Sequence, residues 1–264
     1  MKKRLPFVLK TAFLIAFVLV QFCAFAGKEK REYYSLTVYH FATAQQQQLI
    51  EQYLQNAYLP ALHKMGYTKL GVFTSWANDT SADKRIYVFQ TISSLQELAT
   101  QQEKLDADAA YQSAGEAYIN APYTSPAFSR KENIVLYAFP LAPKMQVPQL
   151  KSPNSERVYE LRSYESTSEK IFANKVKMFN DGDEVGLFKR LNFNAAFYSS
   201  VIAGSKMPNL MYMTCFENMA DRDAHWKTFG DDAYWKTLSA KPEYQHNVSK
   251  NDMVFLRPTA YSDF

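Results

Sequence analysis

Two short segments, Tyr34-Ser-Leu-Thr-Val-Tyr39 and Tyr159-Glu-Leu-Arg-Ser-Tyr164, match at Tyr, Leu and Tyr with a constant spacing of 125 residues. The spacing is 126 between Met65-Gly66-Tyr67 and Leu191-Asn192-Phe193, and it is 124 across 86–112 without a gap. Loop insertions produce such small changes in spacing. A period of this length far exceeds the roughly 20 to 50 residues of solenoid units. The sequence therefore predicts two tandem copies of one unit.

Each copy is predicted to run strand, helix, strand, strand, helix, strand. In the first helix, apolar residues recur every four positions from Leu49 to Met65, and Pro60 should kink it. Gly66 and Asn192, at equivalent positions, are the residue types that best tolerate a left-handed conformation after a helix. The predicted elements are strands 33–40, 69–77, 84–91 and 134–139 with helices 49–65 and 94–120 in the first copy, and strands 157–164, 193–201, 209–216 and 252–257 with helices 168–190 and 218–240 in the second.

This order of elements is the ferredoxin-like arrangement. A four-stranded sheet with both helices on one face leaves its other face bare, and a large bare apolar face needs a cover. Two such sheets in one chain can cover each other. We therefore predict an α+β fold in which two tandem ferredoxin-like repeats form a dimeric α+β barrel within a single chain.

The domain plan has four parts. Residues 33–140 and 157–264 are the two repeats, and 141–156 is an extended linker marked by Pro143, Pro148 and Pro153. Residues 1–26 have the pattern of a signal peptide: a basic start, an apolar run over 11–20, and small residues at Ala24 and Ala26. Cleavage near Ala26 would export the protein to the periplasm or the medium. An uncleaved anchor is the alternative, because the apolar run approaches the roughly 20 residues that span a bilayer.

Charge and cysteine content exclude several classes of protein. Four of the 30 basic residues lie in the leader, which leaves 26 basic against 26 acidic residues. A mature chain without net charge or a basic block has little attraction for nucleic acid or for an anionic membrane. Cleavage also removes Cys23, so Cys215 is left alone in an apolar run, where a buried thiol is expected rather than a disulfide or a reactive nucleophile.

The second copy resembles the NIPSNAP family. The resemblance covers 157–264, and the first copy is more diverged. It rests on separated blocks that occur in the family's order: Tyr159-Glu-Leu-Arg-Ser-Tyr164, Met207-Pro-Asn-Leu-Met-Tyr-Met213, Phe216-Glu-Asn-Met-Ala-Asp-Arg222, His225-Trp-Lys-Thr-Phe229 and Trp235-Lys-Thr-Leu238. It implies a dimeric α+β barrel, in agreement with the strand order. The wider fold group includes small-molecule oxygenases, haem-handling enzymes and binding proteins, and NIPSNAP members share no established reaction.

Glu160, Arg162 and Tyr164 alternate along one strand and so share a face. If the opposite face, with Tyr159 and Leu161, packs on the helices, Arg162 points between the sheets, where its guanidinium could clamp an anion. The alternative is a structural ion pair between Glu160 and Arg162.

Four aromatic residues complete the set of ligand-binding candidates. Tyr198 and Tyr212 lie on predicted strands and suit either an aromatic ligand or a packed interface. His225 and Trp226 lie on a predicted helix, where His225 could act as a base and Trp226 as a stacking wall, although neither is part of a metal-ligand motif. No metal or cofactor is predicted, and the sequence contains no phosphate loop, nucleophile elbow or His-Glu-x-x-His helix.

The main hypothesis is an exported protein of undetermined activity that binds a small aromatic or acidic organic molecule in the barrel. One alternative is a cofactor-independent oxygenase or isomerase with His225 as base and Arg162 stabilising an enolate-like anion. Another is a structural or protein-interaction module. No nucleic-acid partner and no stable membrane association after leader cleavage are expected, and self-association into a homo-oligomer is left open.

Overall fold

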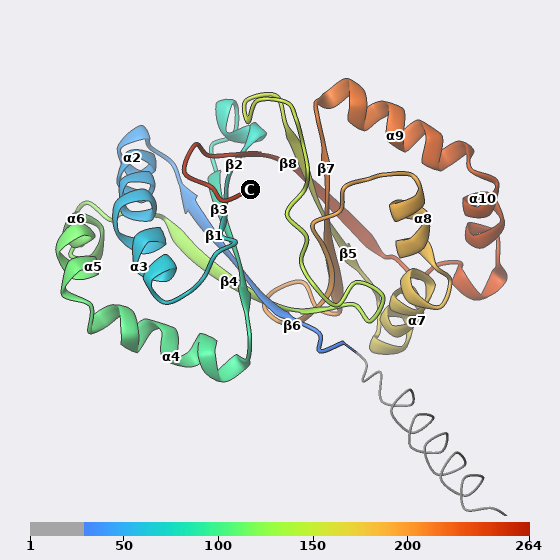
Figure 1. Ribbon diagram of the computed structural model, residues 1–264, viewed down its shortest axis with the longest axis horizontal. Helices are drawn as coiled ribbons and strands as arrows, with labels where there is room; N and C mark the ends of the chain where they lie inside the picture. Colours follow the sequence, from blue (N-terminus) through green and yellow to red (C-terminus); the bar gives the residue numbers. More distant parts are fainter. Residues whose placement is uncertain (1–28) are drawn as a thin grey trace, which may run out of the picture. The chain divides into compact units, whose positions relative to one another are not determined.

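The computed structural model describes residues 29–264, and the predicted leader lies outside this range. Residues 31–264 form one compact unit in which two groups of helices cover a barrel of strands (Figure 1). Among the described residues, no helix is long and apolar enough to cross a membrane.

Both copies have the predicted order of elements, with the helical segments subdivided. The first copy consists of β1 (Tyr33–Phe41), α2 (Ala44–Tyr53), the π-helix η1 (Leu54–Tyr58), α3 (Leu59–Lys64), β2 (Gly71–Ser75), the 3-10 helix η2 (Trp76–Asp79), β3 (Lys84–Ile92), α4 (Leu95–Asp106), α5 (Ala109–Ala114), α6 (Glu116–Ile119) and β4 (Arg130–Ala138). The second consists of β5 (Val158–Glu165), α7 (Glu169–Asn180), α8 (Glu184–Arg190), β6 (Phe197–Ala203), β7 (Asn209–Phe216), α9 (Met219–Asp231), α10 (Ala233–Ser239), η3 (Pro242–Tyr244) and β8 (Lys250–Pro258).

Local sequence accounts for the helix ends. Thr43 caps α2 in a capping box with Gln46, while Ser94, Ser168 and Asn218 cap the later helices with side-chain oxygens. At the helix ends predicted to turn left-handed, Gly66 has φ 94° and Asn192 has φ 58°, which confirms the prediction.

At Pro60, where the sequence predicts a kink, the structure has no break in the helical segment. Pro60 is the second residue of α3, which directly follows the π-helix η1. A proline in a helix lacks the N–H donor, and its ring meets the carbonyl four residues earlier, which here belongs to Asn56. The wider π-helical turn of η1 therefore precedes Pro60 within one continuous helical segment.

The eight strands close into one antiparallel barrel in the order β1-β3-β2-β8-β5-β7-β6-β4. Each copy contributes a sheet with ferredoxin-like strand order, and the two sheets join by backbone pairing between β2 and β8 and between β4 and β6. Closure pairs the sheet edges that would otherwise expose unpaired backbone groups. The predicted fold class is therefore confirmed.

The barrel interior is a core shared by both copies. Phe89 of β3 stacks on Phe197 of β6 with ring centroids 4.6 Å apart, and Phe73 of β2 lies 5.0 Å from Tyr159 of β5. Cys215 is buried in the same cluster, where burial raises the pKa of its thiol. The expectation of an unreactive buried thiol agrees with this position.

The face of β5 that points into the barrel is the opposite of the face that the sequence analysis expected there. Tyr159 and Leu161 lie in the interior cluster, whereas Glu160 and Arg162 point towards the helices of the second copy. The interpretation that Arg162 points between the sheets is therefore wrong. The interior face of β5 packs against the sheet of the other copy. Because β5 has apolar residues on both faces, its sequence pattern does not indicate which face packs there.

One end of the barrel is closed by segments outside the strands. Met145 of the linker is buried in the interior cluster, and Val147 and Leu150 pack against it. The C-terminal Phe264 also enters this cluster, with its ring 5.4 Å from that of Phe73. The opposite end is lined by polar and charged side chains.

A shared core predicts that the two copies unfold together. Phe89→Ala should lower the free energy of unfolding by about 3 to 5 kcal/mol, because it removes a fully buried ring from the interface between the sheets. Urea unfolding followed by tryptophan fluorescence and by circular dichroism should give coincident transitions. The exposed Leu95→Ala should shift stability by less than about 0.5 kcal/mol. Separate transitions, with only the first copy destabilised, would contradict a common core.

Candidate functional site

The structure brings five of the seven predicted site residues into one buried network beneath the helices of the second copy. Glu160 is 0% exposed. Its carboxylate accepts hydrogen bonds from Arg162 Nε at 2.5 Å, from Arg222 Nε at 2.7 Å and from Trp226 Nε1 at 2.9 Å. Arg222, on α9, was not among the predicted residues.

The network continues from Arg162 to two tyrosines. Arg162 Nη1 donates to the hydroxyl of Tyr164 at 3.0 Å, and that hydroxyl lies 2.8 Å from the hydroxyl of Tyr212. The guanidinium of Arg162 also lies over the indole of Trp226, 4.0 Å from the ring centroid. Arg162 is thus held by a carboxylate, a phenol and an aromatic face at once.

The remaining two candidates take packing positions. Tyr198 stacks on Tyr212 with centroids 5.6 Å apart. His225 lies against the rings of Phe193 and Phe216, and its Nδ1 is 2.8 Å from the backbone carbonyl oxygen of Asp221. Among the described residues, no hydrogen bond or ion pair links His225 to Glu160 or Arg162, so the geometry does not join His225 with Arg162 in one reaction centre.

Burial decides what this network can do. Breaking a buried ion pair by removing one partner typically costs about 3 to 5 kcal/mol, because it leaves an unpaired buried charge. A ligand that entered here would have to displace donors that already satisfy Glu160. The arrangement therefore favours the structural ion pair, which was the alternative reading of Glu160 and Arg162.

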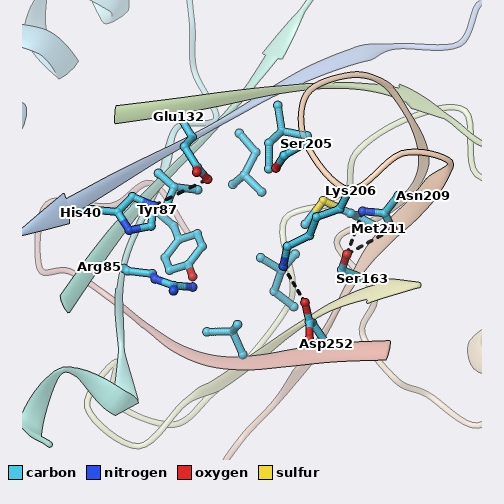
Figure 2. Close-up of a pocket in the computed structure, with 15 residues that line it drawn as sticks. His40, Arg85, Tyr87, Glu132, Ser163, Ser205, Lys206, Asn209, Met211 and Asp252 are labelled. Carbon is cyan, nitrogen blue, oxygen red and sulfur yellow. Dashed lines mark hydrogen bonds and ion pairs between the residues drawn. The ribbon is translucent and has the colours of Figure 1, made fainter. Parts of the chain in front are cut away.

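A different polar cavity lies inside the open end of the barrel (Figure 2). Its volume is about 70 Å³, with a floor of aliphatic and methionine side chains. Strands of both copies contribute its polar wall, which consists of His40, Arg85, Tyr87, Glu132, Ser163, Ser205, Lys206, Asn209 and Asp252. We call this cavity the barrel mouth.

His40 is the buried titratable group of the barrel mouth, at 4% exposure. Its Nδ1 lies 2.8 Å from Asp83 Oδ1, and its Nε2 lies 3.6 Å from Glu132 Oε2 and 3.4 Å from Arg130 Nη2. A carboxylate on Nδ1 favours the tautomer with its proton on Nδ1, so the Nε2 lone pair of His40 accepts the hydrogen bond from Arg130 Nη2 on the side away from Asp83.

Arg85 and Tyr87 stand side by side on β3 (Figure 2). Arg85 donates from Nε and Nη2 to Asp83 Oδ2 at 3.0 and 2.7 Å. Burial alone would raise the pKa of Asp83, but hydrogen bonds from Arg85 and His40 outweigh it and hold the pKa below its usual value. Burial raises the pKa of Tyr87, although Arg85 opposes the shift, so Tyr87 is a neutral hydrogen-bonding phenol at neutral pH.

The ion pairs of the barrel mouth are partly exposed, unlike that of Glu160. The side chains of Arg85 and Asp83 are 39% and 47% exposed, and Lys206 pairs with Asp252 at the rim at 2.5 Å. Solvent-exposed pairs typically contribute only about 0 to 1 kcal/mol. A ligand carboxylate could therefore replace Asp83 or Asp252 at little energetic cost, which makes the barrel mouth the better candidate site.

Sequence reasoning missed the barrel mouth, although a signal was present. His40 extends the alternation of Tyr34, Leu36 and Val38, and Arg85 extends that of Tyr87 and Phe89, so each places a charged or titratable residue on an interior face. Among residues 29–264, no group of three or more His, Cys, Asp or Glu side chains is placed to hold a metal ion.

Residues 159–263 match the model of the family described as NIPSNAP. Residues 159–263 are thus the NIPSNAP-like part of this chain. This part contains Glu160, Arg162, Tyr164, Tyr212 and Trp226. The barrel mouth is built from both copies: His40, Arg85, Tyr87 and Glu132 lie outside the matched range, whereas Ser163, Ser205, Lys206, Asn209 and Asp252 lie inside it. A comparison with curated proteins gives no match.

Solved structures are similar to all or to part of this chain. A protein described as a "putative monooxygenase" from Lactobacillus acidophilus NCFM is 12% identical, with a TM-score of 0.55 over 87% of this chain and 94% of that chain. A NIPSNAP-like domain protein from Burkholderia xenovorans is 14% identical over 40% of this chain and 89% of that one, with a TM-score of 0.37. A NIPSNAP family protein from Agrobacterium tumefaciens str. C58 is 15% identical over 46% and 98%, also with a TM-score of 0.37. The first likeness shows the tandem dimeric α+β barrel fold.

The NIPSNAP domain should depend on Glu160 for stability. Glu160→Gln should lower the free energy of unfolding by about 3 to 5 kcal/mol, because Arg162 and Arg222 would lose the carboxylate that both contact. Urea unfolding measures the loss, with the exposed Glu156→Gln as the matched control. A stability close to that of the wild type would mean that the network is dispensable for folding and open to a ligand.

Proposed function

We propose that this protein binds a small organic acid in the barrel mouth. The observation that carries the proposal is a set of partly exposed ion pairs, with Arg85 foremost, above an apolar floor inside a barrel that is closed at its other end. Arginine suits a carboxylate because its planar guanidinium donates two parallel hydrogen bonds. The neutral phenol of Tyr87 supplies a further hydrogen-bonding group beside it.

The protein is proposed to act after export, with residues 1–26 removed. The pattern of a basic start, an apolar run and Ala24-Phe25-Ala26 supports this placement. Cleavage after Ala26 leaves intact every strand and helix described above, since the first of them begins at Tyr33.

Native mass spectrometry of the protein purified from its own host tests ligand and leader together. We expect the mass of a chain that begins at Gly27, with an added small molecule that is lost in Arg85→Gln. The matched control is Arg190→Gln, because Arg190 also forms a partly exposed pair with an aspartate, Asp232, away from the barrel mouth. An unliganded protein would instead favour a structural or protein-interaction module, and a mass that includes 1–26 would indicate a retained leader.

A second candidate is a cofactor-independent isomerase or oxygenase, and the His40–Asp83 pair favours it. Asp83 would hold Nδ1–H while the substrate displaces Arg130 from Nε2 of His40. Nε2 then takes a proton from the carbon next to a carbonyl, leaving an enolate that Arg85 stabilises. Returning the proton to the other end of the enolate completes an isomerisation without a cofactor. In this role His40 and Arg85 replace His225 and Arg162, which the structure keeps apart from one another.

Phenylpyruvate, an enolisable aromatic acid, is a suitable probe of this second candidate. The wild-type protein should accelerate its keto–enol interconversion, followed by the ultraviolet absorbance of the enol, and Asp83→Asn should reduce the rate by a factor of about 100 or more, in the range of a positioned general base. The exposed Asp223→Asn is the control. A wild-type rate equal to that of buffer would rule out His40 as a base towards such carbon acids.

A further inference from the structure

The wall of the barrel has a notch beside Arg85. Strand β2 is short, and Ser75 is its last residue paired with β8, opposite Leu256. Strand β8 begins much earlier, at Lys250, and β3 begins at Lys84. The chain leaves the sheet after Ser75 to form η2, so no β2 residue separates the outer ends of β3 and β8 there.

The equivalent place in the second copy is covered. Strand β6 continues until Ala203 pairs with Val135 of β4. Gly204 then packs so closely on Ile134 that a Cβ at this position would lie 3.3 Å from the Ile134 side chain. Ser205 and Lys206 continue over the barrel mouth. The notch beside Arg85 is therefore a difference between the copies rather than a property of the repeat.

A groove of about 280 Å³ lies at the notch, on the outside of the barrel. Its aromatic walls are Trp76 of η2 and Phe255 of β8, with ring centroids 6.0 Å apart, and the half-exposed Met253 lies beside them. We call this hollow the outer groove. It shares Arg85, Tyr87 and Val254 with the barrel mouth, so the same three side chains line both hollows.

Size decides which part of a ligand each hollow can take. An engineered apolar cavity of about 150 Å³ holds a benzene ring, whereas one water needs only about 10 to 15 Å³ of probe-occupied volume. At about 70 Å³, the barrel mouth is too small for a ring but large enough for a carboxylate in place of a few waters. The outer groove has both the room and the aromatic walls for a ring.

We infer that the notch joins the barrel mouth and the outer groove into one bipartite site for an aromatic acid whose ring and carboxylate are separated by a short chain. The carboxylate lies in the barrel mouth at Arg85, and the ring lies in the outer groove against Trp76, Phe255 and Met253. This inference rests on the proposed function, because it adds a ring and its position to the acid already placed at Arg85.

Isothermal titration calorimetry with three probes tests the bipartite site. Phenylacetate has both parts, acetate lacks the ring, and 2-phenylethanol lacks the carboxylate. Phenylacetate should bind the wild-type protein at least tenfold more tightly than either of the others, since burying a phenyl ring and pairing a carboxylate each contribute at least this factor.

Variants assign the two parts of the site. Trp76→Ala should weaken phenylacetate about tenfold or more while leaving acetate unchanged, and Arg85→Gln should weaken both acids. Tyr123→Ala, which removes a 99% exposed aromatic ring elsewhere, is the matched control and should change neither. If Trp76→Ala fails to fold, Met253→Ala removes a half-exposed part of the same wall and should weaken phenylacetate alone, about threefold.

The possible failures are distinguishable. If phenylacetate binds no more tightly than acetate, or if Trp76→Ala behaves like Tyr123→Ala, the bipartite site is wrong while the acid site at Arg85 stands. If 2-phenylethanol binds as tightly as phenylacetate, the carboxylate has no anchor at Arg85, and both proposals are wrong. If neither acid binds, the proposed function fails and the inference fails with it.

Discussion

The pairing of sheet edges across the two copies is the constraint on which the rest of this structure depends. A ferredoxin-like sheet has two edges with unpaired backbone groups and one uncovered apolar face. Backbone pairing of β2 with β8 and of β4 with β6 satisfies the edges, and the same closure turns both uncovered faces inward. The interior core, with Phe89 on Phe197, exists because the sheets of the two copies close on each other.

Closure also sorts the charged residues into two environments. On the helix side, Glu160 is fully buried and receives donors from Arg162, Arg222 and Trp226, so its charge is satisfied internally. At the barrel mouth, the pair of Arg85 and Asp83 remains in contact with water. Buried pairs resist exchange of partners and exposed pairs allow it. For this reason the buried cluster around Glu160 favours a structural role, whereas the exposed pairs at the barrel mouth are the better place for an anionic ligand.

The two copies have diverged in complementary ways. The second copy keeps the residues that match the NIPSNAP family model and uses them to tie α9 to β5. The first copy has Ser35 and Thr37 at the positions of Glu160 and Arg162, but it contributes His40, Arg85 and Tyr87 to the barrel mouth. Its shorter β2 leaves open a notch that the loop after β6 covers in the other copy. Divergence within one framework thus gives a single asymmetric opening instead of two equivalent ones.

The sequence by itself determined the repeat, the order of strands and helices, the left-handed positions at Gly66 and Asn192, and the barrel, because these follow from spacing, periodicity and the need to cover two bare sheets. It also indicated that Glu160, Arg162 and Tyr164 belong together, because alternate residues of a strand share a face. Only the tertiary structure decided which face that is, since β5 has apolar residues on both sides. The barrel mouth likewise appeared only after folding. Its charged residues come from separate segments of the chain and form no sequence motif: His40, Asp83, Arg85 and Lys206. Strand register and barrel closure bring them to one end of the barrel.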